Sequence, residues 1–335
     1  MTLKKINDAY ISVLDLVPVN AGGNARESLL NSMELAQHVE ELGYNRYWLA
    51  EHHNMPGIAS SATVVIMGQI ANATDRIRVG SGGIMLPNHA PLVVAEQIGT
   101  LESFFPDRID LGLGRAPGTD QLTAFALRRH KQGGAESFPS DVEELQQYFS
   151  KTGTNHVRAI PGEGLDIPIW LLGSSDFSAR LAAQKGMHFS FASHFAPAFT
   201  VPALQLYRNN FEPSDSLKKP YAMIGLNVIA ADTDEKAEYL ATSIQQQFLS
   251  LTRGRPDKLQ PPVESMEHIW TPEEKAAVEQ SLDPKATIVG SPETVKEKLV
   301  NFIEETDADE VIINSTIYNH EDRMRSYEIV AEIAD

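Results

Sequence analysis

Short apolar runs alternate with amphipathic stretches along most of this chain. The runs have the length of buried strands, and the stretches have the spacing of helices that pack one face on a sheet. The runs predict strands at Tyr10–Val17, Arg46–Ala50, Ile77–Leu86, Ile109–Gly114, Pro168–Leu172, His188–Ala192, Tyr221–Ala230 and Glu310–Asn314. The stretches predict helices at Arg26–Leu42, Ala62–Thr74, Pro91–Phe105, Asp176–Gln184, Phe199–Asn210, Asp234–Thr252, Ser291–Glu305 and Glu321–Ala334.

Eight strands connected by helices predict an α/β fold with a parallel sheet covered on both faces. Eight such units close into a (β/α)₈ barrel, the TIM barrel. An open doubly wound sheet is the alternative, but no G-x-G-x-x-G follows the first strand. The 335 residues suit one barrel domain over residues 1–335, with irregular insertions at about 116–166 and 253–285 on the C-terminal face. The first insertion contains a helical stretch near Ser140–Phe149.

Composition narrows the class of protein. Hydrophobic residues make up 42% of the chain, a globular content. The net charge of −17 argues against nucleic acid or an anionic membrane as a partner. The absence of cysteine excludes disulfides, thiol nucleophiles and Cys-ligated metal centres. Since neither a signal-like apolar stretch nor a membrane-spanning run is present, we expect a cytoplasmic protein.

The second predicted strand ends in three titratable residues, Glu51, His52 and His53. Barrel enzymes carry their working residues at such strand ends, and alternation along a strand turns His52 away from Glu51 and His53. One interpretation is that these three residues form a polar, solvent-exposed end of the strand. A metal site is another, although adjacent residues rarely converge on one ion. We favour an acid–base or hydrogen-bonding role for these residues in a cleft, because the pKa of a histidine lies near neutrality. His89 and His194 also follow strands. A place in the pocket lining is one interpretation of them, and we favour the other, that they are polar loop residues.

The third predicted strand is rich in glycine, with Gly80, Gly82 and Gly83 within four residues. Glycine weakens a central strand unless something must approach the backbone closely. A bulge or a tight barrel corner would account for these residues. A flat ligand pressed against the backbone is the sharper hypothesis.

Two further strand ends carry groups that suit a phosphate. Arg115 follows the fourth strand, where it is either a phosphate ligand or a salt-bridge partner. After the fifth strand, Gly173 leads into a helix opened by Ser174 and Ser175, with Ser178 on the same face. Free N–H groups at a helix start bind anions, although N-capping alone also explains the serines. Together with Arg115, the segment predicts a phosphate site.

Four runs, in order, resemble the bacterial luciferase-like, FMN-dependent monooxygenases. They are WLAEHHN, VGSGGIMLP, LGLGRAPGTD and IWLLGSSDFSARLAAQKG. The chain is most similar to the small single-chain members of unknown substrate. The resemblance covers essentially the whole chain, including Gly290-Ser291-Pro292-Glu293, and implies a (β/α)₈ barrel with insertions.

The resemblance implies roles for the residues at these strand ends. His52 matches the active-site histidine beside the flavin ring, and Glu51 matches its acidic neighbour. Gly82-Gly83 falls where the family holds a non-prolyl cis peptide against the ring. Arg115 matches the arginine that binds the FMN phosphate.

The remaining matches lie after the fifth strand. The resemblance places the phosphate-binding segment at Leu172, Gly173, Ser174, Ser175 and Ser178. Ser193 stands where luciferase itself has an aromatic residue near the flavin. Because of this departure we do not predict light emission.

The resemblance implies an oxidoreductase that uses reduced FMN and O₂ on a small organic substrate, without a metal. A separate flavin reductase would supply the reduced FMN, and family habit implies a homodimer. A deazaflavin-dependent hydride-transfer enzyme and a non-catalytic flavin-binding protein are the alternatives within the superfamily. A metal hydrolase on the same barrel is the alternative at the level of the fold.

Overall fold

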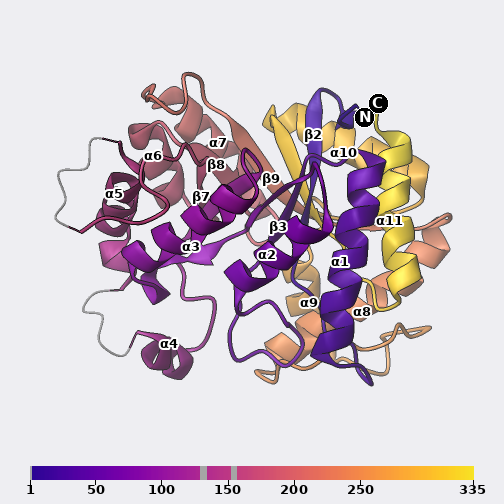
Figure 1. Cartoon of the computed structure of the whole chain (residues 1–335). Helices are drawn as coiled ribbons and strands as arrows, with labels where there is room; N and C mark the ends of the chain where they lie inside the picture. Colours follow the sequence, from indigo (N-terminus) through magenta and orange to yellow (C-terminus); the bar gives the residue numbers. More distant parts are fainter. Residues whose placement is uncertain (1, 129–133, 152–156) are drawn as a thin grey trace.

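The computed structural model describes residues 2–128, 134–151 and 157–335. Parallel strands close into a barrel within these residues, so the predicted TIM barrel is confirmed (Figure 1). The ring consists of β2 (Ala9–Asp15), β3 (Arg46–Leu49), β4 (Arg78–Ser81), β6 (Ile109–Gly114), β7 (Ile169–Gly173), β8 (His188–Phe191), β9 (Ala222–Ala230) and β11 (Glu310–Asn314). Pairing of β2 with β3 and with β11 closes the ring.

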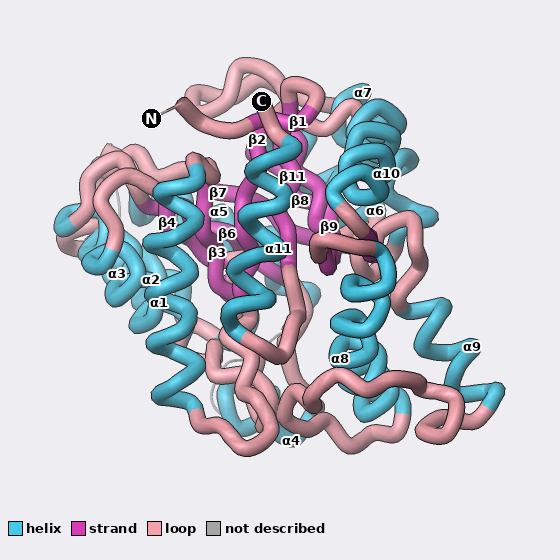
Figure 2. The backbone as a smooth tube through the Cα atoms, turned by 90° about the vertical axis from the view of Figure 1, so that its right-hand side faces the viewer, coloured by secondary structure: helices cyan, strands magenta, loops and turns pink. Residues whose placement is uncertain are grey.

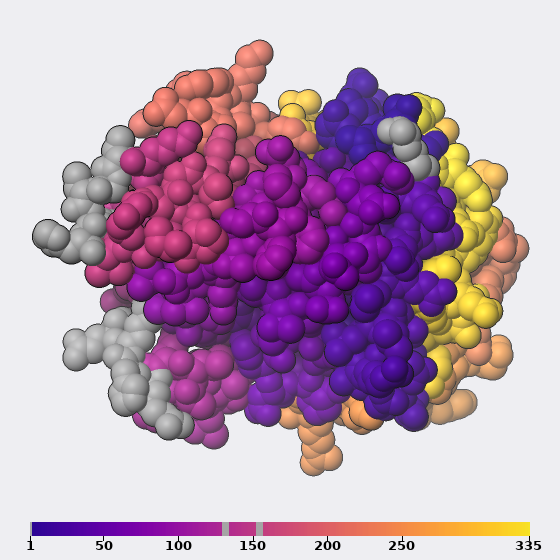
Figure 3. Space-filling view, viewed as in Figure 1, coloured from indigo at the N-terminus to yellow at the C-terminus, as the bar shows by residue number. Residues whose placement is uncertain are grey.

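Helices cover the outside of the barrel, where Figure 2 shows α11 in front of the strands, with α1 and α8 on either side of it. Side chains fill the gaps between the elements on the face seen in Figure 3. The covering helices are α1 (Ala25–Leu42), α2 (Thr63–Ala73), α3 (Pro91–Phe104), α6 (Asp176–Lys185), α7 (Thr200–Asn209), α8 (Asp234–Thr252), α10 (Pro292–Thr306) and α11 (His320–Ile333). Local sequence sets their ends: the Asn24 side chain caps α1, and Gly43, at φ 89°, ends it. Among the described helices none is long and apolar enough to cross a membrane.

Several shorter elements complete the chain. They are β1 (Lys5–Ile6), β5 (Ile84–Met85), β10 (Thr287–Gly290), the 3₁₀ turns Leu86–Asn88, Ala135–Ser137 and Pro197–Phe199, and the helices α4 (Gln121–Leu127), α5 (Phe138–Phe149) and α9 (Pro272–Ser281). The helix expected near residues 140–149 is therefore present as α5. Residues 129–133 and 152–156 of the first expected insertion lie outside the described residues.

Two strand predictions need correction. The predicted strand Ile77–Leu86 is split, because the chain leaves the β4 ladder at Gly82–Gly83 and rejoins β6 as β5. The sequence interpretation also missed β10. This short strand pairs only with the C-terminal part of β9, at residues 227–230, beyond most of the contact between β9 and β11. A four-residue strand with one pairing partner leaves little periodic signal in the sequence.

Apolar side chains fill both sides of the sheet. Every residue of β9 is buried, since one face of this strand packs on helices and the other on the barrel interior. Trp48 and Trp170 lie in the interior with their rings 5.2 Å apart, edge to face. Met223 and Ile312 pack with them. This cluster supports the floor of any cavity at the C-terminal end.

Ion pairs hold the N-terminal end of the barrel together. The Arg46 guanidinium lies 2.6 Å from Asp110 and 3.0 Å from Glu310, and Arg78 lies 2.7 Å from Asp110. Burial alone would raise the pKa of Asp110, but the two arginines outweigh it and hold that pKa below its ordinary value. Asp110 is therefore charged, and each charge in this cluster has a partner.

We expect Asp110→Ala to destabilise the fold by about 3–5 kcal/mol, because it leaves two arginines without their shared carboxylate. Urea unfolding at pH 7 measures this loss. Lys275→Ala is the control, since its pair with Glu279 is exposed and worth less than about 0.5 kcal/mol. A loss below about 1 kcal/mol for Asp110→Ala would contradict the assignment.

Candidate functional site

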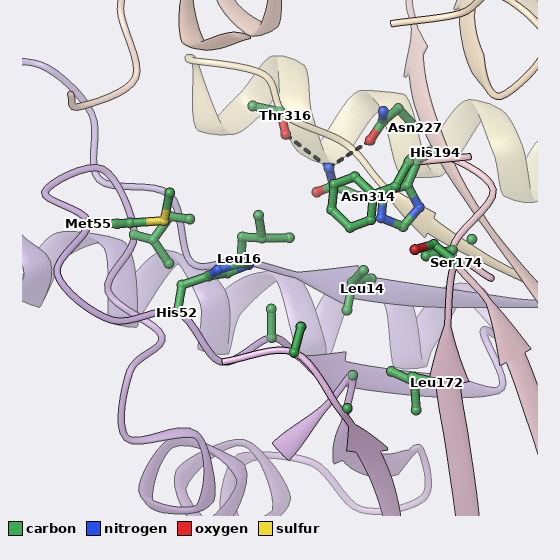
Figure 4. Close-up of a pocket in the computed structure, with 18 of the residues that line it drawn as sticks. Leu14, Leu16, His52, Met55, Leu172, Ser174, His194, Asn227, Asn314 and Thr316 are labelled. Carbon is green, nitrogen blue, oxygen red and sulfur yellow. Dashed lines mark hydrogen bonds between the residues drawn. The ribbon is translucent and has the colours of Figure 1, made fainter. Parts of the chain in front are cut away.

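A cavity of about 320 Å³ lies at the C-terminal ends of the barrel strands. Figure 4 shows side chains from several strands around it, among them Leu14, Leu172 and Asn314. Residues of α8 and of the segment 256–257 complete the wall. The strand ends therefore form one common chamber, as expected for a barrel enzyme.

Eight of the ten predicted site residues line this cavity. They are His52, Gly82, Arg115, Leu172, Gly173, Ser174, Ser175 and Ser178. Glu51 and Gly83 do not line it and lie directly behind its wall. The fold thus brings together residues that are up to 126 positions apart in the sequence, from His52 to Ser178.

One end of the cavity is cationic and rich in hydrogen-bond donors. Arg115 stacks on the Phe177 ring at 4.0 Å, and no described carboxylate pairs with it. Ser175 is the N-cap residue of α6, but its side chain makes no capping hydrogen bond, so the first N–H groups of the helix are not capped by it. A Cβ at Gly173 would lie 2.5 Å from Ser178 Oγ, so only glycine lets the strand approach the helix start. This end can bind an anion.

The glycine-rich exit of β4 forms another wall. The Gly82–Gly83 peptide bond is cis, the geometry that the resemblance implied. A Cβ at Gly82 would lie 2.7 Å from Leu14 Cδ1, and one at Gly83 would lie 2.8 Å from the Gly112 carbonyl oxygen. The backbone is therefore bare on both sides of this bond, because no side chain fits there.

Ser81 joins β4 to β6 at the point where the two strands separate. Its hydroxyl donates to the Gly112 carbonyl oxygen at 2.8 Å, and its oxygen accepts from the Gly112 N–H at 3.0 Å. A Cβ at Gly112 would lie 2.0 Å from the Ser81 carbonyl oxygen. The serine side chain thus replaces the ladder hydrogen bonds that the chain loses before Gly82.

His52 faces the cavity, whereas Glu51 and His53 turn away from it, which is the predicted arrangement although β3 itself ends at Leu49. Burial lowers the pKa of His52, and the Gly118 carbonyl group opposes this only in part. The imidazole is therefore neutral at pH 7. A neutral imidazole offers one donor and one acceptor, which suits it for moving a proton.

Glu51 is buried and does not line the cavity, but its hydrogen bonds connect neighbouring strand exits. Its carboxylate accepts hydrogen bonds from His53 Nε2 at 2.9 Å, from His89 Nε2 at 2.9 Å and from the Met85 N–H at 3.1 Å. Burial raises the pKa of Glu51, but these hydrogen bonds outweigh it and lower the pKa overall. His89, interpreted from sequence as a polar loop residue, is one of its partners. Glu51 thus anchors the exits of β3 and β5 next to His52.

Sequence reasoning missed an asparagine pair on the far wall. Asn314 Nδ2 donates to Asn227 Oδ1 at 3.0 Å and to Thr316 Oγ1 at 3.1 Å (Figure 4). Asn227 Nδ2 in turn donates to Thr287 Oγ1 at 3.2 Å. The one available signal was an asparagine within the apolar strand β9 and another at the end of β11, directly after three apolar residues.

His194, expected as a polar loop residue, also lies in the cavity wall. Its ring packs on Gly225, where a Cβ would come within 2.9 Å of it, and on the Phe195 ring at 4.2 Å. Burial lowers the pKa of His194 to about 4. Its Nδ1 atom is buried and has no hydrogen-bond partner within the described part of the chain.

The parallel barrel carries, in one chamber at its C-terminal end, a cationic wall and a neutral histidine, the arrangement of a barrel enzyme's site. The model of the luciferase-like monooxygenase family matches residues 11–310. The chain belongs to this family, so the resemblance found in the sequence is confirmed.

Three relatives match over nearly their whole length. The uncharacterized protein YvbT of Bacillus subtilis (strain 168) is 61% identical over 335 residues, covering 99% of both chains. A luciferase-like monooxygenase of Escherichia coli (strain K12) is 52% identical, covering 97% of this chain and 96% of its own. The N-acetyl-S-alkylcysteine monooxygenase of Bacillus subtilis (strain 168) is 32% identical, covering 96% and 97%.

Solved structures share the fold. Apo-MsnO8 is 32% identical with a TM-score of 0.86, covering 96% of this chain and 97% of its own. The oxygenating constituent of 3,6-diketocamphane monooxygenase from Pseudomonas putida, solved with FMN, has a TM-score of 0.74 at 17% identity and covers 96% of both chains. An F420-dependent secondary alcohol dehydrogenase has a TM-score of 0.69 at 12% identity and covers 98% of both.

The lowered pKa of His194 predicts a pH dependence of stability. The unfolded chain binds a proton at this histidine below about pH 6.5, whereas the folded protein binds it only near pH 4. Folding stability should therefore fall as the pH drops from 6.5 toward 4, and His194→Gln should flatten this slope. Urea unfolding across this range measures it, with His268→Gln, on an exposed loop, as the control. Equal slopes for His194→Gln and wild type would refute the prediction.

Proposed function

We propose that this protein is a flavoprotein monooxygenase that binds FMN and oxidises a small organic substrate with O₂. A separate flavin reductase supplies the FMN in its reduced form. The observation that carries the proposal is the convergence of Arg115 and the α6 start with His52 and the bare Gly82–Gly83 backbone in one cavity. Family membership supports the same conclusion.

The residues present fit FMN. The Arg115 guanidinium and the uncapped N–H groups after Ser175 would hold its phosphate, since both favour a dianion. The Gly82–Gly83 backbone, which carries no Cβ, would receive the flat ring system. When bound, reduced FMN supplies the electrons with which O₂ is activated.

The residues of the chain itself would position the reacting groups, exclude water from the chamber and transfer a proton. Apolar side chains such as Leu14, Leu172 and Ile312 exclude water from the chamber. His52, neutral at pH 7, can donate or accept a proton at the reacting groups. Glu51 acts indirectly, because its hydrogen bonds to His53 and Met85 fix the strand exits beside His52.

A deazaflavin-dependent hydride-transfer enzyme is the second candidate. The fold shared with an F420-dependent alcohol dehydrogenase favours it. Spectral titration of the purified protein with FMN and with the deazaflavin separates the two. If the protein binds the deazaflavin and not FMN, the hydride-transfer enzyme becomes the first candidate. Flavin binding without O₂ consumption would indicate a non-catalytic flavin-binding protein.

We also propose that the protein forms a homodimer. The described surface of α2 and α3 exposes Val65, Val93 and Phe104, large apolar side chains that a second copy could cover. Sedimentation at micromolar concentration should give about twice the 36.9 kDa mass of the chain. A single 36.9 kDa species would contradict this proposal.

Arg115→Ala should weaken FMN binding by roughly 10- to 100-fold, because a hydrogen bond to a charged group is worth about 1.5–3 kcal/mol. Riboflavin, which lacks the phosphate, should lose little affinity. Fluorescence titration with both ligands measures the difference. Arg180→Ala, on the exposed side of α6, is the matched control. Equal losses for FMN and riboflavin would exclude Arg115 as the phosphate ligand.

His52→Ala should leave FMN affinity within a few-fold of wild type and lower turnover by roughly 10²–10⁴, the scale of a positioned acid–base group. Stopped-flow oxidation of the reduced-flavin complex measures the effect. The neighbouring variant His53→Ala should cost less, since His53 contacts Glu51 and not the cavity. Unchanged rates for His52→Ala would reduce His52 to a structural residue.

A further inference from the structure

The cavity has a second side that the proposed cofactor residues leave free. In the closed strand order, β9 lies four strands from β4 in either direction, and β11 lies four strands from β6. Asn227 and Asn314 therefore face Gly82 and Arg115 from across the barrel. A ligand held at the exits of β4, β6 and β7 leaves the wall of β9 and β11 for a second molecule.

This wall carries no charge. Ile312 forms its floor, and Ile244 and Phe248 of α8 form its upper part. Among the described residues that line the cavity, the fully charged side chains are Arg115, at the anion-binding end, and Asp257, which is exposed at the rim. Burying an unpaired charge against such a wall is unfavourable, so the chamber selects an uncharged group.

One polar atom on this wall is fixed and unused. Asn314 Nδ2 is held by two acceptors, Asn227 Oδ1 and Thr316 Oγ1, which orients the carboxamide. No described residue donates to Asn314 Oδ1, and Figure 4 shows this oxygen turned toward the cavity. A buried acceptor of this kind discriminates strongly, because a ligand without a donor leaves it unpaired.

We infer that the wall of β9, β11 and α8 is the substrate site, and that it accepts a small uncharged molecule, largely apolar, whose O–H or N–H donates to Asn314 Oδ1. This inference rests on the proposed function, since it assigns the rest of the cavity to the flavin. Asn314 is the residue that determines specificity for the donor.

Three probes of seven or eight heavy atoms test the inference by binding and not by turnover. They are 1-hexanol, which has a donor, 2-hexanone, which has an acceptor only, and hexanoate, which is charged. Ligand-observed NMR titrations are made on the full chain, alone and saturated with FMN. We expect 1-hexanol to bind roughly 3- to 10-fold more tightly than 2-hexanone, the value of one neutral hydrogen bond. In the FMN-saturated protein, where the phosphate occupies the anion-binding end, hexanoate should bind more weakly than both.

Asn314→Leu should abolish the preference for 1-hexanol over 2-hexanone, and Thr316→Val, which removes one of the acceptors that hold the amide, should reduce it. Met55→Leu, in the loop after β3 and away from the wall of β9 and β11, is the control and should keep the preference. Thr316→Val also serves if Asn314→Leu does not fold.

Equal binding of the two neutral probes to wild type, or binding of hexanoate to the FMN-saturated protein as tight as that of 1-hexanol, would overturn the inference. A preference that survives in both Asn314→Leu and Thr316→Val would overturn it as well. So would a large loss of FMN affinity in Asn314→Leu with the probe preference unchanged, because Asn314 would then contact the flavin. If wild type binds no FMN in the same titration, the proposed function fails, whereas FMN binding without probe preference removes the inference alone.

Discussion

The close approach of β4 and β6 at Ser81 and Gly112 is the contact on which the candidate site depends. A side chain at position 112 would collide with the Ser81 backbone, and the Ser81 hydroxyl takes over the lost ladder hydrogen bonds. The chain can then turn at Gly82–Gly83 while β6 continues straight to Arg115. The bare Gly82–Gly83 wall and the cationic end of the cavity are thus supported by the same junction, which keeps them at a fixed separation.

Much of the fold could be predicted because its signals are local. Alternation of apolar runs and amphipathic stretches identifies the eight barrel strands, and Gly43 marks the end of α1 through its own backbone conformation. The break in the run Ile77–Leu86 could not be located in this way, since apolar residues stand on both sides of it. Thr287–Gly290 was missed because a short strand depends on its partner, β9, and not on its own periodicity.

The residues of the candidate site also differ in whether their signal is local in the sequence. Arg115 and the serines after β7 were found because a strand end and a helix start are readable in a few consecutive residues. The role of Glu51 could not be found in this way, because its hydrogen-bond partner His89 is 38 positions away. Asn227 and Asn314, 87 positions apart, were missed for the same reason. An asparagine in an apolar strand gives no indication of which partner satisfies it until the barrel is closed.

The paired charges around Arg46 close the N-terminal end of the barrel, and this has a kinetic consequence. Molecules that occupy the chamber have to pass the opposite end, between the strand exits and α8. A barrel plugged at one end therefore exchanges the contents of its chamber with solvent at the other end. Changes at the strand exits or on α8 alter entry and release together.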